Sequence, residues 1–241
     1  MPRLDIHNSE LPIICQSCEV RHKGICGALT PQQLTALSEH TRQVTIDAGT
    51  ELIADQEPIS QYANILTGVI KLTKLLQDGR QQIVGLQFAP DLLGRPFQNE
   101  SNVGVEAATS VKFCTFPRSA LEKAIRESSS LSSRLHEQAL RELDEAREWM
   151  LTLGRKTARE KVASFLRLVA TSSDPERHSN QGTVIFELPL TRSAMADFLG
   201  LTIETVSRQM TALRKEGIIE MEKSKLIIIT NLEALNATCG Y

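Results

Sequence analysis

Hydrophobic residues recur at helical spacing in two short segments near the C-terminus, which begin after Thr191 and Thr202. Each threonine can cap the helix that follows it, because its side-chain oxygen can accept a hydrogen bond from an unpaired backbone N–H. Gly200 can adopt the left-handed conformation that ends the first helix. Ala196 is small enough to let two helices cross closely, and Val206 points the second helix back at the first. The segment therefore has the spacing of a helix-turn-helix.

The second of these helices directs a polar face outward, and this face carries Glu204, Ser207 and Arg208. Arginine can donate two hydrogen bonds to guanine, glutamate can accept one from cytosine, and serine can bond to bases or phosphates. A simpler interpretation is an exposed ion pair between Glu204 and Arg208, which lie four residues apart. The helix-turn-helix spacing favours a helix that reads double-stranded DNA. Two apolar runs, at 217–221 and 225–229, then predict a two-stranded wing.

The pattern changes between residues 42 and 116, where short apolar runs alternate with glycine-containing turns. The runs Ile65–Leu76 and Gln82–Phe88 flank Asp78-Gly79, which predicts a hairpin. Many short strands separated by glycine turns are typical of a small barrel or jelly roll.

A long helix is predicted from Ser130 to about Leu153. Apolar and small residues along it are spaced alternately three and four apart, which is the seam of two paired helices. The seam consists of His136, Ala139, Leu143, Ala146, Met150 and Leu153. A helix packed only on its own domain is the alternative, but the flanking polar residues favour a homodimer interface. Two copies of Glu148 beside this seam would repel each other, so we hypothesise that dimerisation is marginal and tunable.

Length and composition indicate an ordinary globular protein of two domains, since the chain has 241 residues, of which 41% are hydrophobic and 23% charged. No apolar run approaches the ~18 residues that span a bilayer. We therefore expect a cytoplasmic protein without a membrane partner. The net charge of −2 argues against non-specific coating of nucleic acid but permits a local basic face. No phosphate-binding loop or nucleophile–base motif is found, so we do not expect an enzyme.

Three of the five cysteines, Cys15, Cys18 and Cys26, fall within a short N-terminal arm. Two cysteines separated by two residues can bind one metal from a single turn, and nearby glycines let the backbone wrap around a larger object. With a fourth cysteine, the arm could ligate either Zn²⁺ or an iron–sulfur cluster. Cys114 is the fourth candidate, although an isolated strand cysteine is more often a core residue. Spacing alone does not separate Cys114 from Cys239.

The order of these elements resembles the cyclic-AMP receptor protein family of bacterial transcription regulators, over almost the whole chain. The resemblance implies an α+β fold with a cysteine arm, a β-roll (jelly roll), a long dimerisation helix and a C-terminal winged helix-turn-helix. We expect these parts to occupy residues 1–29, 30–127, 128–156 and 157–241, respectively. A helix over Ala158–Ala170 and a polar loop over Thr171–Gly182 would lead into the two DNA-binding helices.

Within that family, the cysteines and the residues of the reading helix resemble the FNR (fumarate and nitrate reduction regulator) branch, in which four cysteines hold a [4Fe–4S] cluster. The resemblance implies that the ligands are Cys15, Cys18, Cys26 and Cys114. It also implies a switch in which the chain dimerises at low oxygen and binds palindromic DNA with half-sites like TTGAT. The dimer would then contact RNA polymerase, and the turn Gln77–Gln82 is the expected contact.

Two alternatives keep the same fold. One is a regulator whose cysteines hold a structural zinc ion or sense thiol oxidation. The other is a cyclic-nucleotide-binding module. The second is disfavoured because Arg95 stands where the cyclic-nucleotide branch has a ribose-binding glutamate, and because the Arg-Ser or Arg-Thr pair that binds the cyclic phosphate in that branch has no counterpart around 102–107.

Overall fold

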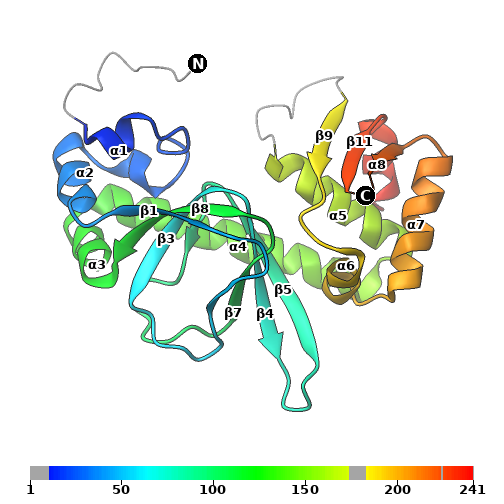
Figure 1. Ribbon diagram of the computed structural model, residues 1–241, viewed down its shortest axis with the longest axis horizontal. Helices are drawn as coiled ribbons and strands as arrows, with labels where there is room; N and C mark the ends of the chain where they lie inside the picture. The colour runs from blue at the N-terminus through cyan, green and yellow to red at the C-terminus, as the bar shows by residue number, and fades with distance from the viewer. Residues whose placement is uncertain (1–10, 174–182, 224, 241) are drawn as a thin grey trace. The chain divides into compact units, whose positions relative to one another are not determined.

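The computed structural model describes residues 11–173, 183–223 and 225–240 and divides into two compact units (Figure 1). The first unit is formed by Met1–Arg80 and Val84–Leu143, and the second by Gln81–Ile83 and Asp144–Tyr241. The expected α+β fold is confirmed, with antiparallel sheets throughout. Among the described residues, none of the helices combines the length and the apolar composition needed to span a membrane.

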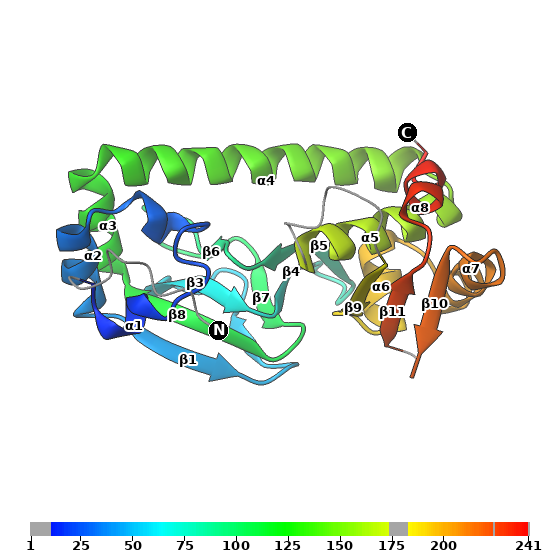
Figure 2. The same ribbon diagram turned by 90° about the horizontal axis from the view of Figure 1, so that it is seen from above.

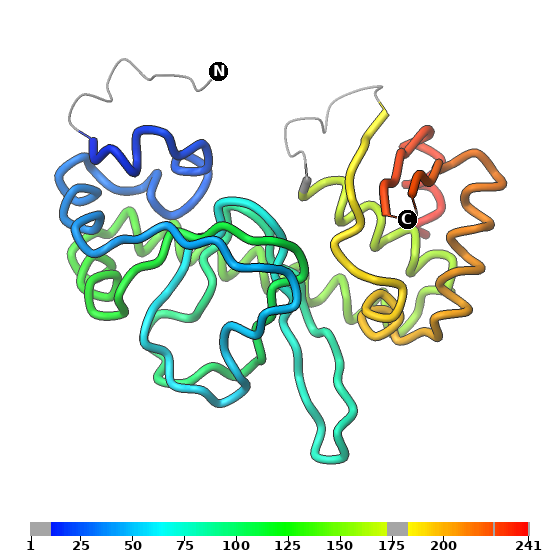
Figure 3. Tube along the Cα trace, in the orientation of Figure 1, coloured from blue at the N-terminus to red at the C-terminus, as the bar shows by residue number. Residues whose placement is uncertain are grey.

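Two four-stranded sheets build the β-roll of the first unit, with strand orders β1-β8-β3-β6 and β2-β7-β4-β5. The strands are β1 (Arg42–Ile46), β2 (Glu51–Ile53), β3 (Gln61–Thr67), β4 (Val69–Leu75), β5 (Gln81–Phe88), β6 (Leu92–Leu93), β7 (Gly104–Ala107) and β8 (Val111–Pro117). Alternate residues of these strands form an apolar core that includes Ala63, Ile65, Ile70, Val105 and Phe113. Figure 3 shows the turn around Gly79 projecting beyond the rest of the roll.

The predicted hairpin is formed by β4 and β5, but the bounds of its first strand were wrong. The run Ile65–Leu76 is divided at Gly68 into the end of β3 and the whole of β4. Gly68 has φ +89°, and a Cβ atom on it would lie 2.4 Å from the carbonyl oxygen of Ser110. Only glycine fits this conformation and this close approach. The chain therefore turns sharply within a run that reads as continuous in hydrophobicity alone.

The arm and two short helices cover the outer face of β3 and β8. They are α1 (Ile13–Gln16), the 3₁₀ helix η2 (Ile25–Ala28), α2 (Pro31–Ser38) and α3 (Arg118–Glu127). Thr30 caps α2, and the side chain of Gln33 returns a bond to the Thr30 backbone. A second apolar cluster lies beneath these helices and includes Ile25, Leu37, Phe116 and Leu121. Figure 2 shows the arm and α3 at the end of the roll where the long helix begins.

That long helix is α4 (Ser129–Arg155), close to its expected bounds. Its first half packs on the roll through Leu131, which is fully buried, and through Gln138. The carboxamide of Gln138 accepts a hydrogen bond from Leu92 N at 3.3 Å and donates one to Leu92 O at 3.2 Å. It therefore replaces a missing strand partner at the edge strand β6.

The second unit contains the predicted winged helix-turn-helix. Its elements are α5 (Ala158–Ser173), β9 (Val184–Glu187), α6 (Arg192–Leu199), α7 (Ile203–Lys215), β10 (Ile219–Glu222), β11 (Leu226–Ile229) and α8 (Leu232–Thr238). Thr191 and Thr202 cap α6 and α7, and Gly200 has φ 60°, as expected. The sequence interpretation missed β9, which pairs with β11, and α8. The expected loop at 171–182 begins later, because α5 extends to Ser173, and its remainder lies outside the described residues.

We expect Gly68→Ala to lower the free energy of unfolding of the first unit by more than about 3 kcal/mol, because the new Cβ meets backbone atoms that cannot move aside. Gly79→Ala is the matched control, since Gly79 has φ +86° but nothing within 4 Å of its added Cβ. It should cost only about 1 kcal/mol. Urea unfolding followed by circular dichroism measures both values, and equal costs would contradict the steric explanation.

Candidate cysteine centre and DNA-binding face

The structure brings together the three arm cysteines and Cys114, which lie about ninety residues apart in the sequence. Cys15 belongs to α1, Cys18 follows it in a turn, Cys26 belongs to η2, and Cys114 lies on β8. Cys18 and Cys26 pack against the apolar cluster that contains Cys114. After burial, the neighbouring cysteines are the next cause that raises the pKa of Cys26 and of Cys114.

The arm follows a chain of single turns that places each cysteine. Cys15 N donates to Pro12 O at 2.8 Å, and Cys18 N donates to Cys15 O at 3.3 Å. Gly27 closes the last turn so tightly that an added Cβ would lie 2.6 Å from His22 O. His22 itself is exposed, and its ring lies beside the Arg21 side chain.

Burial raises the pKa of each of three thiols. The pKa of Cys15 rises, chiefly through desolvation and then through the neighbouring Cys18. Desolvation also raises the pKa of Cys26, and it raises that of Cys114 to about 12. Arg21, which is 6% exposed, acts in the opposite direction on Cys15 and Cys26. The site thus favours neutral thiols until a positively charged group replaces their protons.

The four cysteines do not form a preassembled site for a single ion. Among the described residues, no three His, Cys, Asp or Glu side chains converge closely enough to hold one metal ion. An iron–sulfur cluster is larger than an ion, so four thiolates can reach it from positions farther apart. Cys239 is placed elsewhere, in the core of the second unit, where it is fully buried and its Sγ donates to Leu235 O at 3.3 Å.

Helix α7 presents the expected reading face. Glu204, Ser207 and Arg208 are exposed, while the apolar side of the helix is buried. The Arg208 guanidinium lies 3.5 Å from the hydroxyl of Thr205 on the preceding turn. Its remaining donors are directed to solvent, where they could meet the edge of a base.

Aromatic packing holds the helix-turn-helix on its scaffold. The ring of Phe198, at the end of α6, lies 4.5 Å from that of Trp149 on α4 and 5.9 Å from that of Phe165 on α5. Lys161 on α5 donates to Leu199 O at 3.3 Å, which satisfies a carbonyl at the end of α6. Nothing in the spacing of the sequence indicates that Phe198 and Trp149 pack together.

The seam residues of α4 face solvent in the single chain. Met150 is 73% exposed, Leu143 45% and Leu153 37%. The smaller seam residues His136, Ala139 and Ala146 are also exposed. An apolar stripe of this kind on a long helix is unusual unless another surface covers it.

The hypothesis that two Glu148 carboxylates repel across this seam stays a prediction, because the structure holds a single chain, in which Glu148 has a partner of its own. Glu148 lies on the side of α4 that faces α5, and its Oε1 is 3.5 Å from Lys156 Nζ. The Lys156 side chain is only 7% exposed and also donates to Ser164 Oγ at 3.0 Å. The charge of Glu148 is therefore compensated within its own chain.

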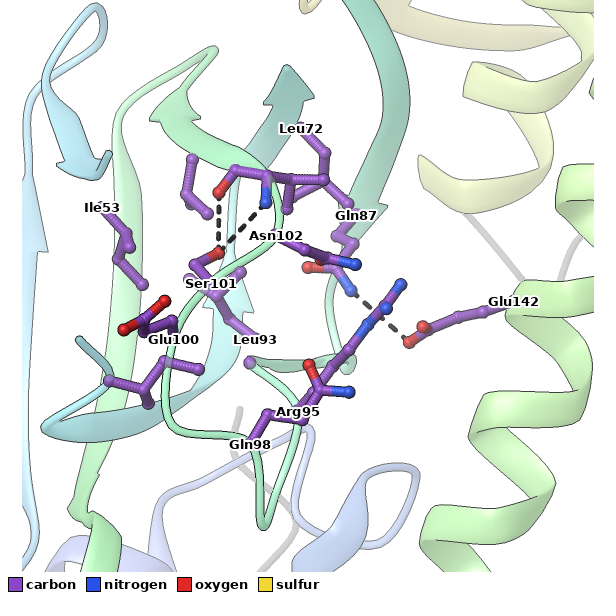
Figure 4. Close-up of a pocket in the computed structure, with 14 residues that line it drawn as sticks. Ile53, Leu72, Gln87, Leu93, Arg95, Gln98, Glu100, Ser101, Asn102 and Glu142 are labelled. Atoms are coloured by element: carbon purple, nitrogen blue, oxygen red, sulfur yellow. Dashed lines mark hydrogen bonds between the residues drawn. The ribbon is translucent and has the colours of Figure 1, made fainter. Parts of the chain in front are cut away.

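The pocket of the β-roll that Arg95 lines is small. It encloses about 50 Å³, whereas pockets for small molecules usually enclose about 300–1,000 Å³. Figure 4 shows Arg95 extending toward Gln87 and Glu142, whose side chains are joined by a hydrogen bond of 3.4 Å. Arg95, noted above as a departure from nucleotide-binding chains, thus lines this small pocket together with polar and apolar side chains.

Comparison with known proteins agrees with this architecture. Residues 160–238 match the family model of the Crp-like helix-turn-helix domain, and residues 43–128 match that of the cyclic nucleotide-binding domain. The FixK2 structure from Bradyrhizobium japonicum superposes with a TM-score of 0.73 at 31% identity, over 83% of this chain and 98% of that one.

Similar sequences carry names of transcription regulators. A "Probable transcriptional activator" of Rhizobium leguminosarum is 52% identical over 96% of this chain and 98% of its own length. "Transcriptional activator protein FnrL" of Cereibacter sphaeroides is 40% identical over 96% of this chain and 95% of its own. "Nitrogen fixation regulation protein FixK" of Bradyrhizobium diazoefficiens is 36% identical over 92% and 94%, respectively. The chain therefore belongs to the CRP/FNR family of DNA-binding transcription regulators.

Proposed function

We propose that this regulator senses oxygen through a [4Fe–4S] cluster held by Cys15, Cys18, Cys26 and Cys114. The observation that carries the proposal is the gathering of three arm thiols and one strand thiol in a partly buried site beside Arg21. When bound, the cluster would supply an oxygen-labile cross-link between the arm and β8. Similarity to a regulator named FnrL supports the same reading.

The arm has a direct route to the long helix. Ile25 is almost fully buried in the cluster of side chains that also contains Leu131 of α4. Ser130 Oγ donates to Ala28 O at 3.0 Å, and Arg134 donates to Lys23 O at 2.8 Å. An ordered arm therefore stabilises the first turns of α4, and release of the arm would remove these bonds.

We propose further that α4 pairs with α4 of a second chain through the six seam residues. Pairing would bury the exposed Leu143, Met150 and Leu153. A two-fold dimer presents two α7 helices to two half-sites, and the residues of α7 suit half-sites like TTGAT. One half-site alone supplies too little binding energy, so DNA affinity would follow dimerisation.

The proposed contact with RNA polymerase is the turn at 77–82. The carboxylate of Asp78 bonds to Arg80 Nε at 2.9 Å, and both side chains are exposed. An exposed turn with a fixed pair of opposite charges is suited to a transient protein contact.

The first experiment is purification without oxygen, followed by an absorbance spectrum and by iron and sulfide assays. We expect about four irons and four sulfides per chain and a visible band that bleaches in air. Sedimentation should show a dimer before air and a monomer after it. Cys114→Ser should abolish the iron, whereas Cys239→Ser should retain it. Colourless protein with one zinc per chain would replace the sensor by a structural metal site and leave the DNA-binding assignment intact.

Arg208→Ala should weaken binding by about 1–3 kcal/mol per half-site and remove discrimination at the guanine of the site, because the bidentate contact reads that base. Lys215→Ala, at the exposed end of the same helix, is the control and should affect all sequences equally. Fluorescence anisotropy with DNA duplexes that differ at single base pairs measures both. Retained guanine preference in Arg208→Ala would contradict this assignment.

Met150→Glu should abolish dimerisation, because it places a charge in each half of the buried seam, and should weaken palindromic DNA binding by at least about tenfold. Glu148→Ala should not tighten the dimer, since it removes a charge on the other side of α4 and leaves Lys156 without that partner. Sedimentation of both variants under anaerobic conditions is the measurement. A tighter dimer in Glu148→Ala would support repulsion between the Glu148 carboxylates of the two chains.

A further inference from the structure

Asn64 is an unexplained polar residue in an apolar part of the first unit. It lies in the middle of β3 and is only 1% exposed. Its Oδ1 has no hydrogen-bond partner among the described residues. Buried polar groups are normally satisfied, so an orphaned carboxamide oxygen calls for a partner that the described residues do not provide.

The strand register places Asn64 directly opposite Cys114 on β8. Residues opposite each other in an antiparallel pair point to the same face, with Cβ atoms about 5 Å apart. That face is the one covered by the arm, because Tyr62 and Leu66, two residues to either side, belong to the cluster under the arm. Ile65, by contrast, belongs to the core between the two sheets.

The arm lies against the Asn64 side chain on this face. A Cβ atom added to Gly24 would lie 3.0 Å from Asn64 Nδ2 and 3.1 Å from Pro90 O, so the carboxamide reaches the arm backbone two residues before Cys26. Asn64 therefore lies between the strand cysteine and the arm that carries the other three. Its carboxamide is part of the wall of the cysteine site.

We propose that the Asn64 carboxamide is a positioning residue of this centre, donating an N–H hydrogen bond to the sulfur of Cys114 or of the bound cluster. The inference rests on the proposed function, since it requires a sulfur acceptor with negative charge. A half-turn of the amide exchanges its oxygen and nitrogen, so the end that is now orphaned can present a donor. Such a bond stabilises the ligated thiolate and makes the cluster harder to oxidise.

Asn64→Leu tests the proposal, because the leucine side chain has the same branching and the same number of heavy atoms but no donor. The anaerobic variant should assemble a cluster with the same iron content, but the visible band should bleach in air about tenfold faster than in the wild type. The metal-free variant should be at least as resistant to urea as the metal-free wild type, because an apolar group replaces an unsatisfied polar one. The two effects thus have opposite signs.

Gln87→Leu is the matched control. Gln87 is 7% exposed, and its Oε1 also has no partner within the part of the chain that the structure describes, but it lines the small cavity beside Glu142 and not the cysteine site. It should bleach at the wild-type rate.

An Asn64→Leu protein that bleaches at the wild-type rate would overturn the inference. A metal-free Asn64→Leu protein less stable than the wild type would also overturn it, since Asn64 would then stabilise the packing of the arm even without a cluster. Wild-type protein that never binds iron would instead refute the proposed function, and with it this inference.

Discussion

The arrangement of the first unit depends on the burial of the arm against β3 and β8. Ile25 is 1% exposed and fixes η2 in an apolar cluster to which the roll, α3 and the start of α4 also contribute. Burial of Ile25 in this cluster is what keeps residues 15–26, and therefore their thiols, close to Cys114. Apolar burial thus assembles the donor set, and the chemistry of the thiols comes second.

Helix α4 satisfies two demands at once. Its part in the first unit packs on the roll through Leu131 and Gln138, and its part in the second unit packs on α5 and α6 through Glu148 and Trp149. In both parts the helix also keeps apolar residues exposed, among them Leu143 and Met150. A helix with a single apolar face buries that face against its own chain. A second apolar stripe is removed from water only when another surface covers it. Dimerisation in our proposal uses this unsatisfied stripe.

The roll illustrates how one fold can serve different inputs. The match to the cyclic nucleotide-binding domain reflects the strands and their turns. In this chain, the corresponding cavity is small and crossed by a hydrogen bond between Gln87 and Glu142. The candidate input site has moved to the outer face of the sheet, where Cys114 meets the arm. Function in this family therefore follows the side chains of each site more closely than the fold.

The sequence by itself determined the elements whose signals are local. Threonine caps, the glycine turn and the apolar spacing specify α6 and α7, because helix ends and helix faces depend on residues within one or two turns. The approximate bounds of α4 and the clustering of three cysteines in the arm could likewise be predicted from the sequence. Short elements such as β9 and α8 were missed, since four to seven residues carry too little periodicity to stand out.

Only the tertiary structure decided which surfaces meet. Periodicity shows that a face is apolar but not what covers it, so it could not place Cys114 beside the arm, Phe198 against Trp149, or Glu148 on the side of Lys156. The sequence did not indicate a role for Asn64, because that role depends on the strand register that places it opposite Cys114 and on its closeness to Gly24, forty residues away in the sequence. Contacts between distant segments depend on how whole elements pack, and that information is spread over the entire chain.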